Sequence, residues 1–361
     1  MHISTALAAV LLSACTAAAA ATCSPGSRPL PFPAGELSKD QFTAKGRRYR
    51  VHLPKSYDPT RRAPVILSYH GAHGTIEKQV ALDGLTDPSR SNRDGDGYVV
   101  VYLQALVPAG ASDPTKTEWQ VAPAAAADKA HIDDLGFTAD VLAALEASLC
   151  VDTRRLYATG KSQGGGFVGR VLACDTSSSS GLAHRFAAFA PVAGAYYILD
   201  TPRRAQCEPT DRVAIPCGGG GAREEGTPAT PILAFHGGAD ETIPYRGEWR
   251  RATGSCLPDI RHWARQWVLP SSSASSSATA EKNTTIPGSR HGVRSAWGGS
   301  GGPGKDGEEE EAARVVLVYA GDDIGHDWPS TAENADNKGG PRAAFNASDE
   351  IVDWFGKWRL E

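Results

Sequence analysis

The sequence has no long hydrophobic run and no excess of charge of one sign. Its 361 residues contain 37 Lys and Arg against 41 Asp and Glu, which gives a formal net charge of −4. No apolar run reaches the ~20 residues that span a bilayer, and the charge balance is too even for a basic nucleic-acid or membrane-surface binder. We therefore expect no nucleic-acid partner and no membrane partner.

The composition is otherwise that of a globular protein with a large buried core. Apolar residues make up 41% of the chain and charged residues 22%, which is ordinary for folded domains. The length allows two domains, but α/β folds often run beyond ~250 residues as one. Nothing in the composition indicates a cofactor or an obligate protein partner.

The first 21 residues have the pattern of a secretory signal peptide. A short apolar run at 3–12 is followed by small residues at 16–21, as in the hydrophobic and cleavage regions of such a signal. A buried N-terminal helix and a lipoprotein signal with Cys15 as the lipidated residue are the alternatives. We expect residues 1–21 to be removed and residues 22–361 to form a secreted, extracellular protein.

Cysteine usage agrees with export. Cys15 lies in the signal, and an even number of cysteines remains, which in an exported chain indicates up to three disulfides. The sequence does not determine the pairing, but Cys207 and Cys217 could close a short loop and are the pair we favour. No pair has the spacing of a metal site, so no metal is expected. The disulfide candidates are Cys23, Cys150, Cys174, Cys207, Cys217 and Cys256.

Two tripeptides match the acceptor pattern for N-glycosylation. They are Asn283-Thr284-Thr285 and Asn346-Ala347-Ser348. Such tripeptides matter only in a eukaryotic secretory pathway, so the prediction of glycans at Asn283 and Asn346 depends on the export signal.

Short apolar segments alternate with helical patterns along the chain. The segment 47–53 alternates polar and apolar residues and is typical of an exposed antiparallel edge strand, whereas near-continuous apolar runs indicate buried parallel strands. Strand, helix and strand in succession indicate an α/β fold with a mainly parallel, doubly wound sheet and helices on both faces. The buried strands are expected at 64–69, 98–103, 156–159, 186–192, 231–235 and 313–319, and the helices at 134–149, 164–173, 259–268 and 349–358.

One segment departs from this alternation. Residues 271–311 contain a Ser/Ala run, a Gly-rich stretch and four consecutive acidic residues, with little periodicity. A smaller departure is the tetraglycine at 218–221. We therefore expect one catalytic domain, 22–361, with a flexible low-complexity insertion at 271–311.

The sharpest chemical signal is the pentapeptide Gly160-Lys161-Ser162-Gln163-Gly164. It has the form Gly-x-Ser-x-Gly, follows a predicted strand and opens a predicted helix, which is the context of a nucleophile elbow. Small flanking residues let the Ser162 hydroxyl project above the sheet, and the helix N-terminus supplies donors for an oxyanion. An ordinary Gly-rich turn is the alternative interpretation.

A serine nucleophile needs a base, and the base needs an orienting acid. In hydrolases of this kind the order along the chain is Ser, then acid, then His. Asp240 follows one predicted strand and His326 follows the last, so both lie at the carboxyl edge of the sheet together with Ser162. We predict the triad Ser162, Asp240 and His326.

Other residues near these positions are weaker candidates. His236 precedes Asp240 by only four residues and is interpreted as a structural or pocket residue. His291 falls in the predicted insertion. Asp322 and Asp323 precede His326 too closely to face it from another loop, and we interpret them as solvated acids.

The oxyanion hole needs two backbone donors. One is the N–H of Gln163, which follows the nucleophile, and the other should come from the loop His70-Gly71-Ala72-His73-Gly74. We favour the N–H of Ala72. His70 and His73 could suggest a metal pair, but no third ligand is near.

A resemblance to a known family is carried by four motifs, which lie at 158–169, 189–197, 235–245 and 325–329. Together they resemble secreted fungal feruloyl esterases of carbohydrate esterase family 1, which are related to acetylxylan esterases and polyhydroxybutyrate depolymerase-like enzymes. The similarity extends over about residues 25–270 and 313–360, and the insertion and the tetraglycine depart from it.

The resemblance implies an α/β-hydrolase fold and a substrate. The family's nucleophile, acid and base fall on Ser162, Asp240 and His326. Feruloyl esterases cleave hydroxycinnamoyl esters from plant cell-wall polysaccharide, so a feruloylated polysaccharide or oligosaccharide is the expected partner, and the pocket must stack an aromatic acid. Trp119, Trp328 and His70 are the candidate substrate contacts.

Two alternatives remain open at this stage. The first is a related activity, an acetylxylan esterase or a polyhydroxybutyrate depolymerase-like esterase. The second is a non-catalytic, carbohydrate-binding protein of the hydrolase fold, which the presence of all three triad residues argues against.

Overall fold

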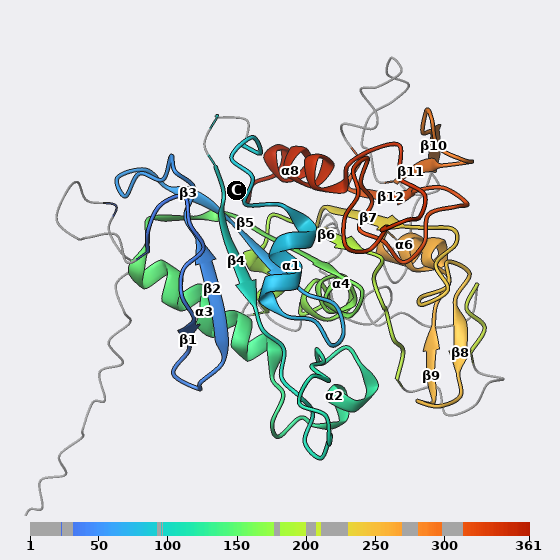
Figure 1. Cartoon of the computed structure of the whole chain (residues 1–361), viewed down its shortest axis with the longest axis horizontal. Coiled ribbons are helices and arrows are strands. Elements are labelled where there is room, and N and C mark those ends of the chain that lie inside the picture. The colour runs from blue at the N-terminus through green and yellow to red at the C-terminus, as the bar shows by residue number, and fades with distance from the viewer. Residues whose placement is uncertain are drawn as a thin grey trace, which may run out of the picture.

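The computed structural model describes residues 32–91, 97–176, 181–199, 207–210, 230–268, 281–297 and 313–361, together with Cys23 and Gly95. A ten-stranded sheet with the strand order β1-β2-β4-β3-β5-β6-β7-β12-β11-β10 forms its centre (Figure 1). The strands are β1 Gln41–Phe42, β2 Arg48–His52, β3 Ala63–Tyr69, β4 Val99–Leu103, β5 Val151–Lys161, β6 Ala188–Val192, β7 Ile232–His236, β10 Lys282–Thr285, β11 Val293–Trp297 and β12 Val315–Tyr319. A separate two-stranded sheet pairs β8 Glu248–Arg250 with β9 Ser255–Leu257.

The central strands are parallel, as the apolar runs predicted. β4, β3, β5, β6, β7 and β12 pair in parallel, while β2 runs antiparallel to β4. All six predicted buried strands are present. The alternating segment 47–53 forms β2, and the two-residue strand β1 lies between β2 and the edge of the sheet. The predicted α/β fold class is therefore confirmed.

Helices cover both faces of the sheet because successive residues of a strand point to opposite sides. Val65 and Leu67 of β3 pack in one core, and Ile66 packs in the other. The first face carries α3 Asp134–Ser148, the π-helical segment η1 Phe167–Leu172 and α6 Ile260–Val268, and the second carries α1 Ile76–Asp83 and α8 Ala347–Lys357. The remaining helical segments are α2 Pro123–Ala127, α4 Gln163–Gly166 and η2 Leu182–Arg185.

The prediction of a flexible insertion at 271–311 is wrong for its middle part. Strands β10 and β11 form an antiparallel hairpin, and β11 pairs with β12 from Val293 opposite Tyr319 to Trp297 opposite Val315. Trp297 packs into one core and Ala296 into the other. The hairpin was not predicted because it is short and lies between low-complexity segments. Residues 271–280 and 298–311 of the predicted insertion lie outside the described residues.

The favoured disulfide is also corrected. Cys207 bonds to Cys256, and not to Cys217, which lies outside the described residues. Two backbone hydrogen bonds between Ile198 and Cys256 hold β9 beside the chain that follows β6, and Cys207, Cys256 and Ile198 form a small buried cluster. Two cysteines that are 49 residues apart in the sequence are therefore close in space.

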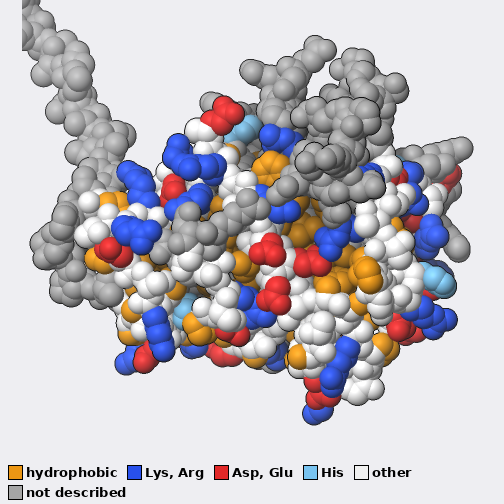
Figure 2. Space-filling view, turned by 90° about the horizontal axis from the view of Figure 1, so that it is seen from above, with side chains coloured by type: hydrophobic (Ala, Val, Ile, Leu, Met, Phe, Trp, Pro, Cys, Tyr) orange, Lys and Arg blue, Asp and Glu red, His pale blue; other side chains and the backbone are white. Residues whose placement is uncertain are grey.

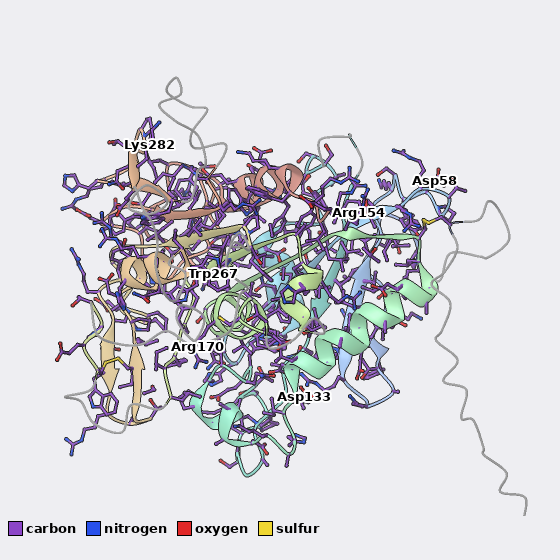
Figure 3. The ribbon with its side chains drawn as sticks, turned by 180° about the vertical axis from the view of Figure 1, so that it is seen from behind. Asp58, Asp133, Arg154, Arg170, Trp267 and Lys282 are labelled. Carbon is purple, nitrogen blue, oxygen red and sulfur yellow. A yellow bond between two sulfur atoms is a disulfide. The ribbon has the colours of Figure 1, made fainter. Side chains whose placement is uncertain are left out.

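A second disulfide anchors the start of the described chain. Cys23 bonds to Cys150, which lies between α3 and β5, with Cα atoms 5.2 Å apart, and Figure 3 shows both disulfides as yellow bonds. Cys174 is disulfide-bonded as well. Residues 1–21, the predicted signal peptide, lie outside the described part, and within that part no helix has the length and apolarity to span a bilayer.

The predicted glycosylation residues both have roles in local structure. Asn283 lies on β10, where its Oδ1 accepts a hydrogen bond from Ser295 Oγ at 2.5 Å. Asn346 caps α8 by accepting from the Ser348 backbone N–H at 3.0 Å, and Ser348 itself is buried. A glycan at either residue stays a prediction.

Charged side chains of both signs are interspersed on the surface. Figure 2 shows Lys and Arg beside Asp and Glu over the face that it presents, in agreement with the near-even charge count of the sequence.

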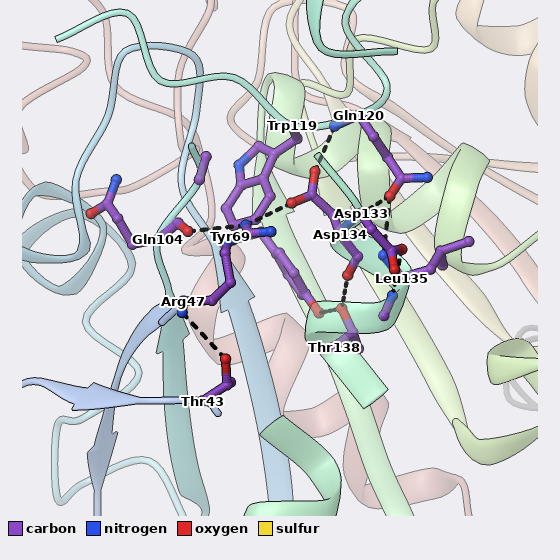
Figure 4. A network of polar contacts seen from close by, with 12 residues as sticks. Thr43, Arg47, Tyr69, Gln104, Trp119, Gln120, Asp133, Asp134, Leu135 and Thr138 are labelled. Atoms are coloured by element: carbon purple, nitrogen blue, oxygen red, sulfur yellow. Dashed lines mark hydrogen bonds and ion pairs between the residues drawn. The ribbon is translucent and has the colours of Figure 1, made fainter. Parts of the chain in front are cut away.

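A buried polar network joins α3 to the sheet (Figure 4). Asp134 is fully buried, and its carboxylate accepts hydrogen bonds from Arg47 at 2.7 Å and from the Gln120 backbone N–H at 2.6 Å. The Gln120 side chain returns a hydrogen bond by accepting from the Asp134 backbone N–H at 2.6 Å. Burial raises the pKa of Asp134, and Arg47 opposes this effect, so the carboxylate depends on its cation.

We predict that Arg47→Met lowers the free energy of unfolding by about 3–5 kcal/mol, because it leaves a buried carboxylate without its ion-pair partner. Chemical denaturation followed by circular dichroism measures the change. Lys45→Met is the matched control, since Lys45 pairs with Asp140 of the same helix at the surface, where its side chain is 66% exposed, and exposed pairs contribute little. Equal stability of the two variants would contradict the role of the network.

Candidate active site

Ser162 lies at a sharp turn between β5 and α4. Its backbone has φ 54° and ψ −117°, a conformation that non-glycine residues rarely adopt. Three backbone hydrogen bonds hold it: its N–H donates to Val192 O at 2.9 Å, and its carbonyl accepts from Gly166 at 2.8 Å and from Ala195 at 2.9 Å. The turn is therefore fixed from both the helix and the end of β6.

Glycines make this turn possible because other backbone passes very close to it. A Cβ added at Gly164 would lie 2.3 Å from the Tyr69 carbonyl oxygen, and one added at Gly166 would lie 2.0 Å from the Ala195 carbonyl oxygen. Neither position has room for a side chain, so the glycines of the motif allow the elbow to pack between the ends of β3 and β6.

The structure brings Asp240 and His326 together at the same edge of the sheet. His326 Nδ1 lies 2.7 Å from Asp240 Oδ2, and Asp240 Oδ1 accepts backbone hydrogen bonds from Thr242 at 3.0 Å and Ile243 at 2.7 Å. Burial would raise the pKa of Asp240, but hydrogen bonds from His236 and His326 hold it well below its usual range. Asp240 is thus an ionised acid that orients an imidazole.

His236 is a second imidazole on the same carboxylate. Its Nε2 lies 2.8 Å from the Ile243 carbonyl oxygen and 3.2 Å from Asp240 Oδ2. The His236 side chain is fully buried, whereas that of His326 is 19% exposed. Only His326 therefore presents an imidazole edge toward the surface, and His236 supports the acid from within the core.

Ser162 is connected to the His326 loop through its neighbour Lys161. Lys161 Nζ lies 2.8 Å from Asp336 Oδ2, and the same oxygen accepts from the backbone N–H of Trp328 at 2.9 Å. Within the described part of the chain Ser162 Oγ makes no hydrogen bond to His326. Such contacts are often long in a free enzyme and tighten when substrate binds.

The electrostatic surroundings favour a neutral His326. Burial lowers the pKa of His326 most, the hydrogen bond to Asp240 raises it, and the charge of Lys161 lowers it further; the net result is a pKa below the usual value. A neutral imidazole with one nitrogen bonded to a carboxylate can act as a general base.

Of the two predicted oxyanion donors, Gln163 directly follows Ser162 in the elbow, and Ala72 lies in the loop after β3. Gln163 is the first residue of α4, where backbone N–H groups have no partner within the helix. Ala72 is half-buried in the loop after β3, and its neighbour Gly71 is so near that an added Cβ would lie 3.4 Å from Ser162 Cβ.

The prediction that Trp119, Trp328 and His70 contact the substrate is corrected, because all three side chains are buried. Each is at most 1% exposed. Trp119 Nε1 donates to the His70 carbonyl oxygen at 2.7 Å, and Trp328 Nε1 donates to Ser348 Oγ at 2.9 Å. His70 Nε2 accepts from the Ala105 backbone N–H at 3.1 Å, and burial lowers the pKa of His70 to about 4. These rings hold the loops in place and have no face for a substrate.

Of the weaker candidates, His291 and Asp322 pair with each other. His291 Nδ1 lies 2.7 Å from Asp322 Oδ2, on the side of β12 that faces the β10–β11 hairpin. Neither contacts the Asp240–His326 pair among the described residues.

Tyr197 lies near the site and was missed by sequence reasoning. Its side chain packs in a small cluster with Ala195 and Ile243, whose backbone N–H groups bond to Ser162 and Asp240. Tyr197 follows β6 at the sheet edge, two residues after Ala195, whose N–H bonds the Ser162 carbonyl. Burial raises the pKa of Tyr197, and its side chain is only partly buried. The paired tyrosines after the apolar strand were the available signal.

We predict that Lys161→Met raises the pKa of His326, because it removes a nearby positive charge and leaves Asp336 without its cation. An NMR titration of the His326 imidazole measures this pKa, which in the unchanged chain should lie below the usual ~6.5. Lys161→Arg keeps the charge and should titrate like the unchanged chain. Identical titrations of the Met and Arg variants would count against this electrostatic coupling.

Comparisons with known proteins give a consistent result. No protein-family model matches the chain. Feruloyl esterase B of Piromyces equi is 29% identical over 203 residues, which cover 56% of this chain and 30% of that protein. Feruloyl esterase D of Neurospora crassa is 30% identical over 173 residues, which cover 47% of this chain and 55% of that protein. The chain thus spans less than two thirds of the length of either relative.

Solved structures agree in fold. The acetyl xylan esterase of Aspergillus awamori superposes with a TM-score of 0.51 at 14% identity, covering 89% of this chain and 99% of that structure. A feruloyl esterase module of Clostridium thermocellum in complex with sinapinate has a TM-score of 0.50 at 13% identity, covering 90% and 88%. The chain therefore has the α/β-hydrolase fold, and its sequence is similar to those of feruloyl esterases.

Proposed function

We propose that this chain is a serine carboxylesterase that hydrolyses feruloyl and related hydroxycinnamoyl esters of plant cell-wall polysaccharide. The observation that carries the proposal is the strained elbow of Ser162 at the same sheet edge as the hydrogen-bonded pair Asp240 and His326. The sequence similarity to feruloyl esterases supports the choice of ester.

In the acylation step, His326 acts as the general base. Its Nδ1 donates to Asp240, so Nε2 is the nitrogen left to take the proton of Ser162 Oγ. The oxygen of Ser162 then attacks the ester carbonyl, and the N–H groups of Gln163 and Ala72 stabilise the oxyanion. The ester bond breaks, the sugar hydroxyl leaves with the proton from His326, and the acyl group stays on Ser162.

In the deacylation step, water replaces the sugar. His326 takes a proton from the water, the resulting hydroxide attacks the acyl carbon, and Ser162 recovers its proton as the hydroxycinnamic acid leaves. Asp240 stabilises the imidazolium in both steps. No step requires a cofactor.

The proposed location is extracellular. The signal-like residues 1–21 and the disulfides of the described chain, Cys23–Cys150 and Cys207–Cys256, support it. Mass spectrometry of protein from the culture medium of a secreting host should find a chain that begins after Ala21, and retention of the whole chain inside the cell would oppose secretion.

Acetylated xylan and polyhydroxyalkanoates are the rival substrates within the same chemistry. The similarity to an acetyl xylan esterase rests on fold alone, whereas the similarity to feruloyl esterases is found in sequence. A feruloyl esterase should turn over methyl ferulate faster than either rival substrate.

We predict that Ser162→Ala folds and lowers kcat for methyl ferulate by roughly 10⁴-fold or more, because it removes the nucleophile. A fluorophosphonate probe should label the unchanged chain and not this variant. Ser112→Ala, a change of an exposed loop serine, is the control and should keep full activity. Turnover by Ser162→Ala would rule out the proposed nucleophile, and absence of labelling of the unchanged chain would favour a binding-only protein.

We predict that Tyr197→Ala raises KM for methyl ferulate up to ~10-fold, because ring contacts contribute about 0.5–1.5 kcal/mol. The KM for an acetyl ester should change much less, since its acyl group has no ring to contact. Tyr197→Phe keeps the ring and should resemble the unchanged chain. Equal losses for both esters would contradict a role in recognising the aromatic acid.

A further inference from the structure

We propose that a pocket between the β10–β11 hairpin and the loop after β7 binds sugar units of the polysaccharide that carries the ester. We call it the hairpin pocket. It has a volume of about 460 Å³, and its lining includes Tyr245, Tyr319, Asn283, His291, Arg246 and Asp322. The inference rests on the proposed function, because it assigns this pocket to the alcohol side of the same ester.

Two tyrosine rings form part of the pocket wall. Tyr319 ends β12 and Tyr245 follows β7, and their ring centroids lie 4.8 Å apart at an angle of 71°. A Cβ added at Gly238 would lie 2.0 Å from Tyr319 Oη, so the ring is held against the loop that leads to Asp240. Rigid rings provide the apolar contact area that a sugar ring can pack on.

Polar side chains from the hairpin are held in place beside these rings. Asp322 accepts from Tyr319 Oη at 2.7 Å and lies 2.7 Å from His291 Nδ1. Asn283 Oδ1 accepts from Ser295 Oγ at 2.5 Å. His291 and, in a chain that carries no glycan at Asn283, Asn283 each have a second polar atom, Nε2 and Nδ2, besides the one used in these contacts. Such groups can bond to sugar hydroxyls.

The mixed charge of the pocket favours a neutral ligand. Arg246 is 83% exposed and lies 3.8 Å from Asp259, while Arg261 pairs with Glu281. Asp322 adds a negative charge within the lining. Because the positive charges of the arginines are balanced by neighbouring carboxylates, a neutral saccharide with many hydroxyl groups fits the pocket better than a carboxylate or a phosphate. An anion-binding site would have an excess of positive charge.

The pocket lies beside the loop that supplies the general acid. Gly238 N–H donates to Gly321 O and Ala239 N–H donates to Ile324 O, both at 2.9 Å, so the loops that carry Asp240 and His326 are joined. Asp322 precedes His326 by four residues, which limits their Cα separation to about 14 Å. In the proposed mechanism His326 protonates the departing sugar oxygen, and the proposal places the departing sugar chain toward this pocket.

The hairpin places the pocket at the margin of the sheet. Figure 1 shows β10, β11 and β12 grouped beside β7 and α6, and Figure 3 shows Lys282 of β10 at the outer edge of the molecule. The side chains of Arg246 and His291 in the lining are mostly exposed, so a polysaccharide can reach the pocket from solvent.

Calorimetric titration of the Ser162→Ala chain with an unesterified xylo-oligosaccharide tests the proposal without any turnover. We expect binding, and we expect His291→Ala combined with Asn283→Ala in the same background to weaken it roughly 10-fold, since two hydrogen bonds are lost. His131→Ala, a change of an exposed histidine before α3, is the control and should bind like its parent. Absence of binding, or equal binding by all variants, would overturn the proposal.

A second measurement uses the chain with Ser162 intact. The ratio of kcat/KM for a feruloylated oligosaccharide to kcat/KM for methyl ferulate should fall roughly 10-fold in the His291/Asn283 double variant, through KM. Thermal unfolding of each variant checks the fold, and Tyr319→Phe, which removes only the hydroxyl, provides a milder change that should lower the ratio less. An unchanged ratio in the double variant would overturn the proposal.

If methyl ferulate is not hydrolysed at all, the proposed function fails, while the calorimetric result still decides whether the pocket binds sugar.

Discussion

The positive φ of Ser162 is the constraint on which the rest of the site depends. A non-glycine residue in such a conformation costs about 1–3 kcal/mol and persists only where its surroundings leave no alternative. Here Ser162 donates its N–H to Val192 O and accepts at its carbonyl from Gly166 and Ala195, and these hydrogen bonds supply those surroundings. The glycines around the serine are needed because neighbouring carbonyl oxygens occupy the space where side chains would lie. The elbow is therefore produced by close backbone packing at the ends of three parallel strands.

The proposed acid and base, Asp240 and His326, depend on a second constraint, the burial of Asp240. A carboxylate taken out of water needs hydrogen-bond partners, and Asp240 receives them from two backbone N–H groups and two imidazoles. This surplus of donors leaves His326 free to face outward, because His236 and the backbone already hold the carboxylate. Lys161 adds a positive charge, so the electrostatic state of His326 is set by Lys161 at the end of β5, His236 at the end of β7 and Asp240 in the loop after β7.

The strands predicted from continuous apolar runs agree with the structure, and the disulfide predicted from short sequence spacing does not. Continuous apolar runs identified the six parallel strands because strands buried on both faces have no polar positions. The partner of Cys207 is the distant Cys256, since spatial neighbours across a loop leave no signal in sequence spacing. The hairpin β10–β11 was not predicted because two short strands between low-complexity segments show little periodicity. The hairpin is held in the sheet by the pairing of β11 with β12. Trp119 and Trp328 were assigned to substrate binding, but both side chains are buried. The position of a tryptophan in the sequence does not show whether its side chain faces a substrate or the core.

The sequence by itself determined the six parallel strands, the helices α3, α6 and α8 and the turn at Ser162, because each of these depends on residues close together in the chain. Only the tertiary structure decided which cysteines meet, which imidazole contacts Asp240 from the surface and which from the core, and that a hairpin extends the sheet beside the site. These outcomes depend on contacts between distant segments, where burial and backbone packing select one arrangement among many that the same local patterns allow.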